Sequence, residues 1–439
     1  MSSKIGIGLI GLGTVGTGVA SILQSPKGRN PLVSQINLIS VAVKDKNKKR
    51  KTSIPTTQIT ENPLEVIEDP SIQIIVEVMG GIEPARSLIL RAIELGKSVV
   101  TANKALIARH GDEISEAANK AGVYVLIEAA VGGGIPIIEP LKQSLGSNRV
   151  KKVTGIINGT TNYILTRMSK DGATYKNVLE DAKELGYAES DPTADVEGLD
   201  AADKIAILSG LAFGGSINRE AIPTKGINKL QTRDLDYAKR LGYAVKLLAV
   251  GENLNFSKTE EISSTPLALW VEPTLIPNDH PLASVNGVNN AILVEGDPIG
   301  EVMFYGPGAG AGPTASAVVA DILNIAGIQI MSEKFSSLDP LLSSSSWRAC
   351  ELVESSQISQ KNYIRLITED SPGVIGTIGN IFGKNKVSIQ SIVQFDSSNR
   401  DAEIVVITHE VKKGAIKNAL SKIETLSEVK NIEAHMSCL

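Results

Sequence analysis

The chain has 439 residues, enough for two to four domains that each bury a core. Charged residues make up 21% of it and the formal net charge is −4, which excludes a protein whose overall charge attracts nucleic acid or anionic membranes. No apolar run is expected to reach the ~20 residues that cross a bilayer, and the N-terminus shows no secretory signal pattern. We therefore expect a soluble, cytoplasmic protein with no membrane or nucleic-acid partner.

The two cysteines, Cys350 and Cys438, stand far apart and have no partners at metal-ligand spacing. This spacing argues against a disulfide framework and against a zinc site. Aromatic residues are only 4% of the chain, too few for a platform on which nucleic-acid bases stack.

Residues 1–135 alternate short apolar runs with segments of helical periodicity. Strands are expected over 5–13, 37–43, 72–80, 97–102 and 123–131, and helices over 14–24, 84–95 and 105–121. Because such alternation joins parallel strands through crossover helices, we predict an α/β fold with a doubly wound, Rossmann-type parallel sheet.

The pattern changes after residue 135. Longer helices mixed with strand-like runs at 150–158, 243–251 and 268–276 predict a second, α+β domain over 136–305 for substrate binding and dimerisation. The glycine-rich stretch at 306 opens a helix that we expect to return to the first domain over 306–335. Residues 336–360 are serine-rich and predict a linker. Residues 361–439 follow a βαββαβ order, which predicts a ferredoxin-like domain.

GLGTVG at 11–16 has the G-x-G-x-x-G spacing of a dinucleotide site. An apolar strand precedes it and a helical pattern follows, so its context is that of a phosphate-binding turn rather than an ordinary glycine-rich turn. Gly11 permits the tight turn, Gly13 lets the backbone approach a pyrophosphate, and Gly16 lets the helix pack closely on the strand. We predict a nicotinamide dinucleotide cofactor at this turn.

The end of the second strand distinguishes the two nicotinamide dinucleotides. A cation there accepts the 2′-phosphate of NADP, whereas a carboxylate holds the 2′-hydroxyl of NAD. Here Lys44 comes first and Asp45 follows, at the start of the basic run KDKNKKR. The run is also compatible with a solvated turn. We predict a preference for NADP, with NAD also used.

Residues 182–204 carry seven carboxylates and end at a lysine that opens an apolar run. A solvated acidic loop at a helix N-terminus is one explanation. Against it, Gly186 and Gly198 bend the segment tightly, and the charges lead into a buried helix. A partly desolvated lysine beside carboxylates can have a pKa suited to proton exchange, so Lys204 is a candidate acid–base group.

The same segment resembles the signature of homoserine dehydrogenases. That signature runs alanine, three residues, glycine, then D-P, two residues, D, and G-x-D-x-x-x-K, and its matches here are Ala182, Gly186, Asp191, Pro192, Asp195, Gly198, Asp200 and Lys204. TANKALIA at 101, NGTTNYILTRM at 158 and GPGAGAGPTASAVVADI at 306 are also similar to that family. The resemblance covers roughly residues 4–335. It implies NAD(P)H-dependent interconversion of L-aspartate 4-semialdehyde and L-homoserine in threonine, methionine and isoleucine biosynthesis.

The resemblance also implies a role for individual residues. Lys204 would donate the proton to the carbonyl oxygen, Asp200 would orient it, and Lys104 is the second catalytic candidate, in contact with both substrate and cofactor. Either lysine can be the proton donor. The remaining substrate-binding residues expected are Glu189, Asp195, Tyr187 and Thr160. The cofactor-binding residues expected are Gly11, Leu12, Gly13, Thr14, Val15, Gly16, Lys44, Met79 and Lys104.

Two further sites follow from family resemblance. Several homoserine dehydrogenases hold a monovalent cation, usually sodium, in the loop EAAVGGGIP; oxygen ligands suit such a hard, structural ion. Its ligands here would be Glu128, Val131, Gly133 and Ile135. The C-terminal segment resembles an ACT domain, in which Asp370, Pro372 and Gly373 form the turn that would receive L-threonine as feedback inhibitor.

The ACT domain and the family both favour a homodimer or homotetramer, and the ACT domain can equally serve dimerisation alone. The alternative function is a non-catalytic sensor that binds a dinucleotide and an amino acid.

Overall fold

The computed structural model describes residues 4–48, 50, 54–256, 266–332, 355–357, 359–396 and 401–438. The chain divides into two compact units, Met1–Ser346 and Trp347–Leu439. Most of the expected linker at 336–360, together with Cys350 and Lys49 of the basic run, lies outside the described residues.

The first unit contains a six-stranded parallel sheet in the order β3-β2-β1-β4-β5-β6. This order reverses between β1 and β4, so the carboxyl ends of these two strands flank the crevice where dinucleotides bind in such sheets. The strands are β1 Ile5–Ile10, β2 Ile36–Ala42, β3 Ile59–Thr60, β4 Ile74–Glu77, β5 Ser98–Thr101 and β6 Val125–Leu126. The predicted doubly wound sheet is confirmed, although β3 was not among the expected strands.

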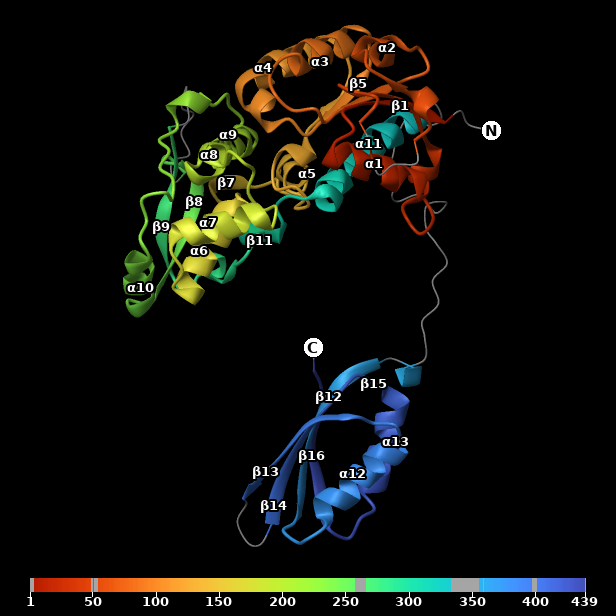
Figure 1. Cartoon of the computed structure of the whole chain (residues 1–439), viewed down its shortest axis with the longest axis vertical. Helices are drawn as coiled ribbons and strands as arrows, with labels where there is room; N and C mark the ends of the chain where they lie inside the picture. Colours follow the sequence, from red (N-terminus) through yellow and green to blue (C-terminus); the bar gives the residue numbers. More distant parts are fainter. Residues whose placement is uncertain are drawn as a thin grey trace. The chain divides into compact units, whose positions relative to one another are not determined.

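Helices cover both faces of this sheet (Figure 1). One face packs against α1 (Thr14–Gln24) and α11 (Ala311–Ser332), which lie side by side. The other face packs against α2 (Pro63–Glu68), α3 (Ala85–Glu94) and α4 (Lys104–Ala121). Because both faces are buried, the strands are almost wholly apolar, as is typical of parallel sheets. Among the described residues, the short 3₁₀ helices η1 (Pro31–Gln35) and η2 (Thr56–Gln58) lie in its connections, and η3 (Glu128–Ala130) follows its last strand.

Helix α11 corrects one expectation from the sequence. Its residues Ala311–Ile330 form a helix long and apolar enough to cross a membrane by length and composition, so the expectation that no such run exists is wrong. Half of that stretch is buried, and Val318, Ile322 and Ile325 belong to the core beneath the parallel sheet. The helix is therefore a core element that carries the chain back to the first domain.

A second, antiparallel sheet has the order β11-β10-β7-β8-β9. Its strands are β7 Arg149–Ile156, β8 Tyr243–Asn253, β9 Leu267–Pro277, β10 Asn289–Asp297 and β11 Gly300–Pro307. One face packs on the largest core of the molecule, to which the buried helices contribute. The elements around the sheet are α5 Ile138–Lys142, α6 Gly159–Asp171, α7 Tyr175–Glu184, α8 Thr193–Val196, α9 Leu199–Phe213, η4 Arg219–Ala221, α10 Thr232–Arg240 and η5 Pro281–Ser284.

Helix α9 begins with charged residues although it is a buried helix. Its first turns carry Asp200, Asp203 and Lys204, and all three are buried together with the apolar residues that follow. Gly198 ends the preceding turn with φ +81°, a conformation that favours glycine, and so lets the chain enter the helix sharply. The buried helix thus brings ionisable groups into the interior, where they need partners.

The second unit has the expected ferredoxin-like order. Its elements are η8 Ser355–Gln357, β12 Ser359–Glu369, α12 Val374–Lys384, β13 Ile389–Asp396, β14 Asp401–Thr408, β15 Val411–Lys412, α13 Lys413–Ile423 and β16 Val429–Cys438. Strand β12 pairs with both β14 and β16, and α12 and α13 pack on one core with Ile364, Leu366 and Phe382. The additional short strand β15 extends the predicted βαββαβ pattern.

Candidate active site

The glycine-rich turn between β1 and α1 has the geometry of a phosphate-binding loop. Gly11 has φ +108°, and a Cβ added at Gly16 would lie 2.1 Å from the Gly11 carbonyl oxygen. These two glycines therefore allow the tight turn and the close helix–strand approach. A Cβ at Gly13 would meet nothing within 4 Å, and no side chain caps the start of α1. Open space and unused N–H groups fit a bound pyrophosphate.

A buried carboxylate organises the neighbouring strand end. Glu77, the last residue of β4, accepts hydrogen bonds from the N–H groups of Met79 (2.8 Å) and Gly80 (3.1 Å) and from the Thr101 hydroxyl (2.6 Å). These bonds fix the loop after β4, which includes Met79. The loop lies close to Gly11, because a Cβ added at Gly11 would contact the Val78 carbonyl. Glu77 is not among the site residues expected from the sequence, although an acidic residue inside an apolar strand is a signal.

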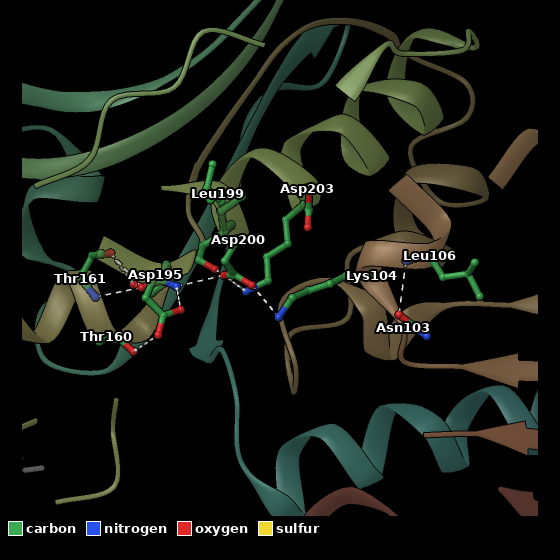
Figure 2. A network of polar contacts seen from close by, with 12 residues as sticks. Asn103, Lys104, Leu106, Thr160, Thr161, Asp195, Leu199, Asp200 and Asp203 are labelled. Carbon is green, nitrogen blue, oxygen red and sulfur yellow. Dashed lines mark hydrogen bonds and ion pairs between the residues drawn. The ribbon is translucent and has the colours of Figure 1, made fainter. Parts of the chain in front are cut away.

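Lys104 begins helix α4 at the same edge of the sheet. Asn103 caps this helix by accepting the N–H of Leu106 at 3.3 Å, and its amide donates to the Gly81 carbonyl at 2.6 Å. The cap thus connects the start of α4 to the loop after β4, so that Lys104 projects from a fixed position (Figure 2).

Three charged side chains meet where α4 approaches α9. Nζ of Lys104 lies 2.5 Å from Oδ1 of Asp200, and Nζ of Lys204 lies 2.7 Å from Oδ2 of the same carboxylate. Figure 2 shows Lys104 and Asp200 pointing toward each other from the two helices. Lys204 also donates to the Ile157 carbonyl at 2.8 Å. An ammonium group has three N–H donors, so Lys204 keeps one for a further acceptor.

Burial and charge set the protonation of this cluster. Burial lowers the pKa of the Lys204 ammonium, against the opposing charge of Asp200, and the positive charge of Lys104 adds to the lowering. Desolvation also works to lower the pKa of Lys104, but Asp200 outweighs it and raises that pKa. Desolvation would raise the pKa of Asp200, yet the two lysines hold it well below its usual range. Lys204 is therefore the lysine that loses its proton more easily.

An amide links the lysine cluster to a second carboxylate. Asn158, which caps α6 through a bond from the Thr161 N–H, donates to Asp195 at 2.7 Å and to Asp200 at 3.0 Å. The Thr160 hydroxyl donates a hydrogen bond to the Tyr187 carbonyl (2.6 Å), and its oxygen lies 3.2 Å from Oδ2 of Asp195. Burial raises the pKa of Asp195. Asn158 is not among the site residues expected from the sequence, where its signal is its place between a strand and a helix.

Of the other residues expected at the substrate site, Tyr187 contacts the network through its backbone. The Tyr187 ring stacks at a tilt on Tyr163, with centroids 5.0 Å apart, and its backbone carbonyl serves Thr160. Glu189 is exposed and makes no hydrogen bond or ion pair within the part of the chain that the structure describes. The structure thus brings Lys104, Lys204, Asp200, Asp195 and Thr160 together and leaves Glu189 outside.

Most residues of the loop EAAVGGGIP at 128–136 are buried. Glu128 accepts the N–H groups of Ile137 (2.6 Å), Ile138 (2.9 Å) and Glu139 (2.8 Å), so its carboxylate caps α5. Its own N–H donates to Asp321 of α11 at 2.8 Å. Burial raises the pKa of Asp321 to about 8. Among the described residues no group of three His, Cys, Asp or Glu side chains has the arrangement of a metal site.

The two remaining predicted sites lie at element ends. Lys44 is exposed two residues after β2, and the carboxylate of the adjacent Asp45 accepts the Asn47 N–H at 2.8 Å. In the second unit, Gly373 has φ +98° and starts α12 without a side-chain cap. The Asp370 carboxylate accepts a hydrogen bond from the Gln394 amide at 3.1 Å.

A dinucleotide-binding sheet whose edge meets a buried lysine, Lys204, and a half-exposed one, Lys104, on one buried carboxylate is typical of a nicotinamide-dependent oxidoreductase. Comparison with known families agrees. The profile described as the NAD-binding domain of homoserine dehydrogenase matches residues 11–128, that of homoserine dehydrogenase matches 136–323, and that of the ACT domain matches 362–428. The chain belongs to the homoserine dehydrogenase family, whose members are NAD(P)-dependent oxidoreductases.

Similar proteins extend over nearly the whole chain. A homoserine dehydrogenase of Synechocystis is 54% identical over 97% of this chain and 97% of its own length, and one of Bacillus subtilis is 37% identical over 98% and 97%. The crystal structure of a homoserine dehydrogenase from Thiobacillus denitrificans has a TM-score of 0.70 at 38% identity, covering 99% of this chain and 98% of that one. The resemblance inferred from the signature segment is confirmed.

Proposed function

We propose that the chain reduces L-aspartate 4-semialdehyde to L-homoserine, and runs the reverse reaction, with Lys204 as the proton donor. The observation that carries this assignment is the pairing of Lys204 and Lys104 on the single carboxylate of Asp200. In the family to which the chain belongs, this reaction serves threonine, methionine and isoleucine biosynthesis, and we propose the same role in the cytoplasm here.

The cofactor, when bound, supplies or accepts the hydride at the substrate's carbonyl carbon. As the carbonyl oxygen gains negative charge, the remaining N–H of Lys204 donates its proton to it. The lowered pKa of Lys204 eases this proton loss, whereas the raised pKa of Lys104 keeps that ammonium charged. Asp200 holds the Nζ atoms of Lys104 and Lys204 close together, because each pairs with one of its two oxygens. In the reverse direction, neutral Lys204 takes the proton of the hydroxyl group.

The substrate's ammonium group would bind to Asp195, with Thr160 and Tyr187 beside it and Glu189 at the outer edge. Support comes from the position of Asp195, whose two oxygens face Asn158 and Thr160 within the same network as Asp200. A bound ammonium would offset the burial that raises the pKa of Asp195. Asp195→Asn should therefore raise the KM for homoserine more than it lowers kcat.

We propose NADP as the preferred cofactor, with NAD also accepted. Lys44 is exposed after β2, and the competing carboxylate of Asp45 is engaged in its own turn. A similar solved structure is a hyperthermophilic archaeal homoserine dehydrogenase in complex with NADPH, with a TM-score of 0.60 at 29% identity, covering 76% of this chain and 100% of that one. Tighter binding of NAD than of NADP at low and moderate salt would contradict this preference.

A structural monovalent cation, sodium, is proposed for the loop after η3. Val131 and Ile135 are buried, and within the described residues the carbonyls of Val131, Gly133 and Ile135 accept no hydrogen bond from the backbone. Unused carbonyl oxygens in a buried loop suit a hard cation. The Glu128 carboxylate is less suited than expected, because three N–H groups already occupy it. Thermal stability should rise with added NaCl more than with tetramethylammonium chloride.

We propose that L-threonine inhibits the enzyme through the ACT domain, at the turn formed by Asp370, Pro372 and Gly373. The open N-terminus of α12 offers N–H groups to the effector's carboxylate. Removal of residues 345–439 should abolish threonine inhibition and leave catalysis in place. A truncated enzyme that is still inhibited would contradict the proposal and leave dimerisation as the domain's role.

A homodimer or homotetramer is the proposed assembly. Met303 and Tyr305 of β11 are exposed on the sheet face that carries Leu293 and Ala291, opposite the face that packs on the largest core. Exposed apolar surface of this kind favours association. Light scattering during size-exclusion chromatography measures the mass directly, and a monomer would contradict the proposal.

The decisive experiment is the oxidation of NADPH by the purified chain in the presence of L-aspartate 4-semialdehyde. We expect turnover with the wild type, and its collapse in Lys204→Ala with NADPH affinity nearly unchanged. The competing function, a non-catalytic sensor, predicts no turnover in either protein. Retained turnover in Lys204→Ala would remove Lys204 from the mechanism but leave the activity.

A further inference from the structure

The first residues of helix α4 form a segment of their own. The backbone of His110 has non-helical angles, φ −128° and ψ 15°, so α4 bends there and residues 104–109 are separated from the rest of the helix. Asn103 fixes the beginning of this segment through its cap. In the proposed function Lys104 acts on a substrate that the second domain holds. A contact between the other end of this segment and the second domain would therefore fix the position of Lys104.

Arg109 makes that second attachment. Its Nη1 donates to Asp203 Oδ1 at 3.2 Å, and its Nε lies 3.3 Å from Glu220 Oε1. Both partners belong to the second domain, so the contact crosses from one domain to the other. Arg109 also donates to the Ala105 carbonyl within its own segment at 3.2 Å, which fixes the direction of its side chain.

Asp203 also forms an ion pair with Arg219 of the second domain. The Nε of Arg219 donates to the same oxygen, Asp203 Oδ1, at 2.5 Å, and its Nη2 donates to the Leu199 carbonyl at 3.0 Å, the first residue of α9. Asp203 and Arg219 are 7% and 6% exposed. Asp203 therefore presents a fixed, buried acceptor to Arg109, one turn along α9 from Asp200.

The polar contacts add to the apolar packing of Ile107 and Ala108 of α4 on the core that contains Ile207 of α9. A cavity of about 930 Å³ opens between α4 and α9, and Arg109, Ile207, Leu211 and Glu220 are among the residues that line it. Farther along, the Ser216 hydroxyl donates a hydrogen bond to the Asp112 carboxylate at 2.5 Å. Because this cavity interrupts the apolar packing beside Arg109, the contact with Asp203 gives the two helices an additional fixed point here.

We propose that Arg109 and Asp203 are positioning residues that hold Lys104 in contact with Asp200, the carboxylate that it shares with Lys204. This inference rests on the proposed roles of the two lysines. The ionisable groups that face Lys104 are Asp200, Asp195, Asp203 and Lys204. When Arg109 is removed, the segment 104–109 loses its anchor on α9 and Lys104 moves away from this group.

The test is Arg109→Met in the full-length enzyme, with Arg86→Met as the matched control. Arg86 also bonds a carboxylate of α4, Glu113, but its other partner, Glu83, lies in the first domain, so it does not reach α9. We expect Arg109→Met to lower kcat for homoserine oxidation about 10- to 100-fold, as for a misplacement near 1 Å. Its Kd for NADP should stay within the error of the wild-type value, and Arg86→Met should keep the wild-type kcat.

The pH profile separates positioning from a loss of folding. Lys104 lowers the pKa of Lys204, so its departure raises that pKa and moves the acidic limb of the kcat profile to higher pH. Arg109→Lys, which restores a charge at the same place, should recover part of kcat and part of the profile. Equal kcat and profiles in Arg109→Met and Arg86→Met would overturn the proposal while Lys204→Ala still tests the mechanism. Turnover retained in Lys204→Ala would instead overturn the proposed function.

Discussion

Two lysines are buried in the second domain, and their surroundings differ. Lys204 is 8% exposed and shares Asp200 with Lys104. Lys246 of β8 is 3% exposed, yet its Nζ partners among the described residues are neutral oxygens: the Val285 carbonyl and the side chains of Asn162 and Asn286, both at 3.2 Å. Burial lowers the pKa of both. Burial alone therefore does not distinguish a catalytic lysine from one that joins elements of the fold.

The difference lies in the charged partners. The Asp200 carboxylate and the Lys104 ammonium have opposite effects on the pKa of Lys204. Lys104 belongs to the dinucleotide domain, so Lys204 lies next to that domain. Around Lys246 the acceptors belong to the loop after η5 and to α6 of the same domain, so the ammonium group joins a loop to a helix. The first arrangement can exchange a proton with a substrate, whereas the second contributes to the stability of the sheet.

The largest expected effect comes from replacing each lysine by methionine, which keeps most of the side chain. Lys204→Met should lower kcat about 10²- to 10⁴-fold, the usual contribution of a general acid. Lys246→Met should leave kcat unchanged within error. Steady-state assays with both substrates measure the pair. A Lys246 variant as inactive as the Lys204 variant would show that the two lysines cannot be separated in this way.

Asp200→Asn tests the carboxylate that makes the two lysines different. Removing one member of a buried ion pair leaves its partners uncompensated and costs about 3–5 kcal/mol. We expect a loss of that order in the free energy of unfolding, measured by urea denaturation, together with loss of turnover. Asp171→Asn is the control, because Asp171 pairs with Arg167 in an exposed i,i+4 contact of ~0.5 kcal/mol or less. Equal losses in both would contradict this account.

The pH dependence of stability should report Lys246 directly. Burial lowers its pKa to about 8, below the ordinary value of 10.5. Between these values the unfolded chain binds a proton that the native protein has released, so wild-type stability rises relative to Lys246→Met as the pH rises from 8 to 10.5. The gain is at most about 3 kcal/mol. Lys151→Met, at an exposed position, controls for the loss of one charge. A constant difference across this range would contradict the prediction.

The surroundings of Lys204 were largely predictable from the sequence, whereas those of Lys246 were not. Lys204 and Asp200 stand in a recognisable signature, and the glycine-rich turn sits between a strand and a helix. Lys246 lies in a strand whose pattern says nothing of its partners, which are 39 to 84 residues away. The contact of Arg109 with Asp203, 94 residues apart, is likewise set by how the domains pack.

The fold shows the same division. The parallel sheet follows from the local alternation of apolar and helical segments, because each βαβ unit is nearly contiguous. The hairpin of β10 and β11 was not expected as two strands, since its register depends on pairing with β7, more than a hundred residues earlier. The 3₁₀ helices and the two-residue strands are too short for periodicity to indicate.

The smallest expected effect comes from giving Lys246 the kind of partner that Lys204 has. Asn286→Asp places a carboxylate where an amide oxygen now lies 3.2 Å from Nζ. The opposite charge should raise the pKa of Lys246, so the variant is stabilised at neutral pH, where the lysine is charged, and the gain disappears above its raised pKa. Because the position is half-buried, we expect about 0.5–1 kcal/mol. Urea denaturation at pH 7 measures it, and the gain should vanish when Lys246→Met is added, as a double-mutant cycle requires. Destabilisation at pH 7, or a gain that persists without the lysine, would mean that charge at this site is not what separates the two lysines.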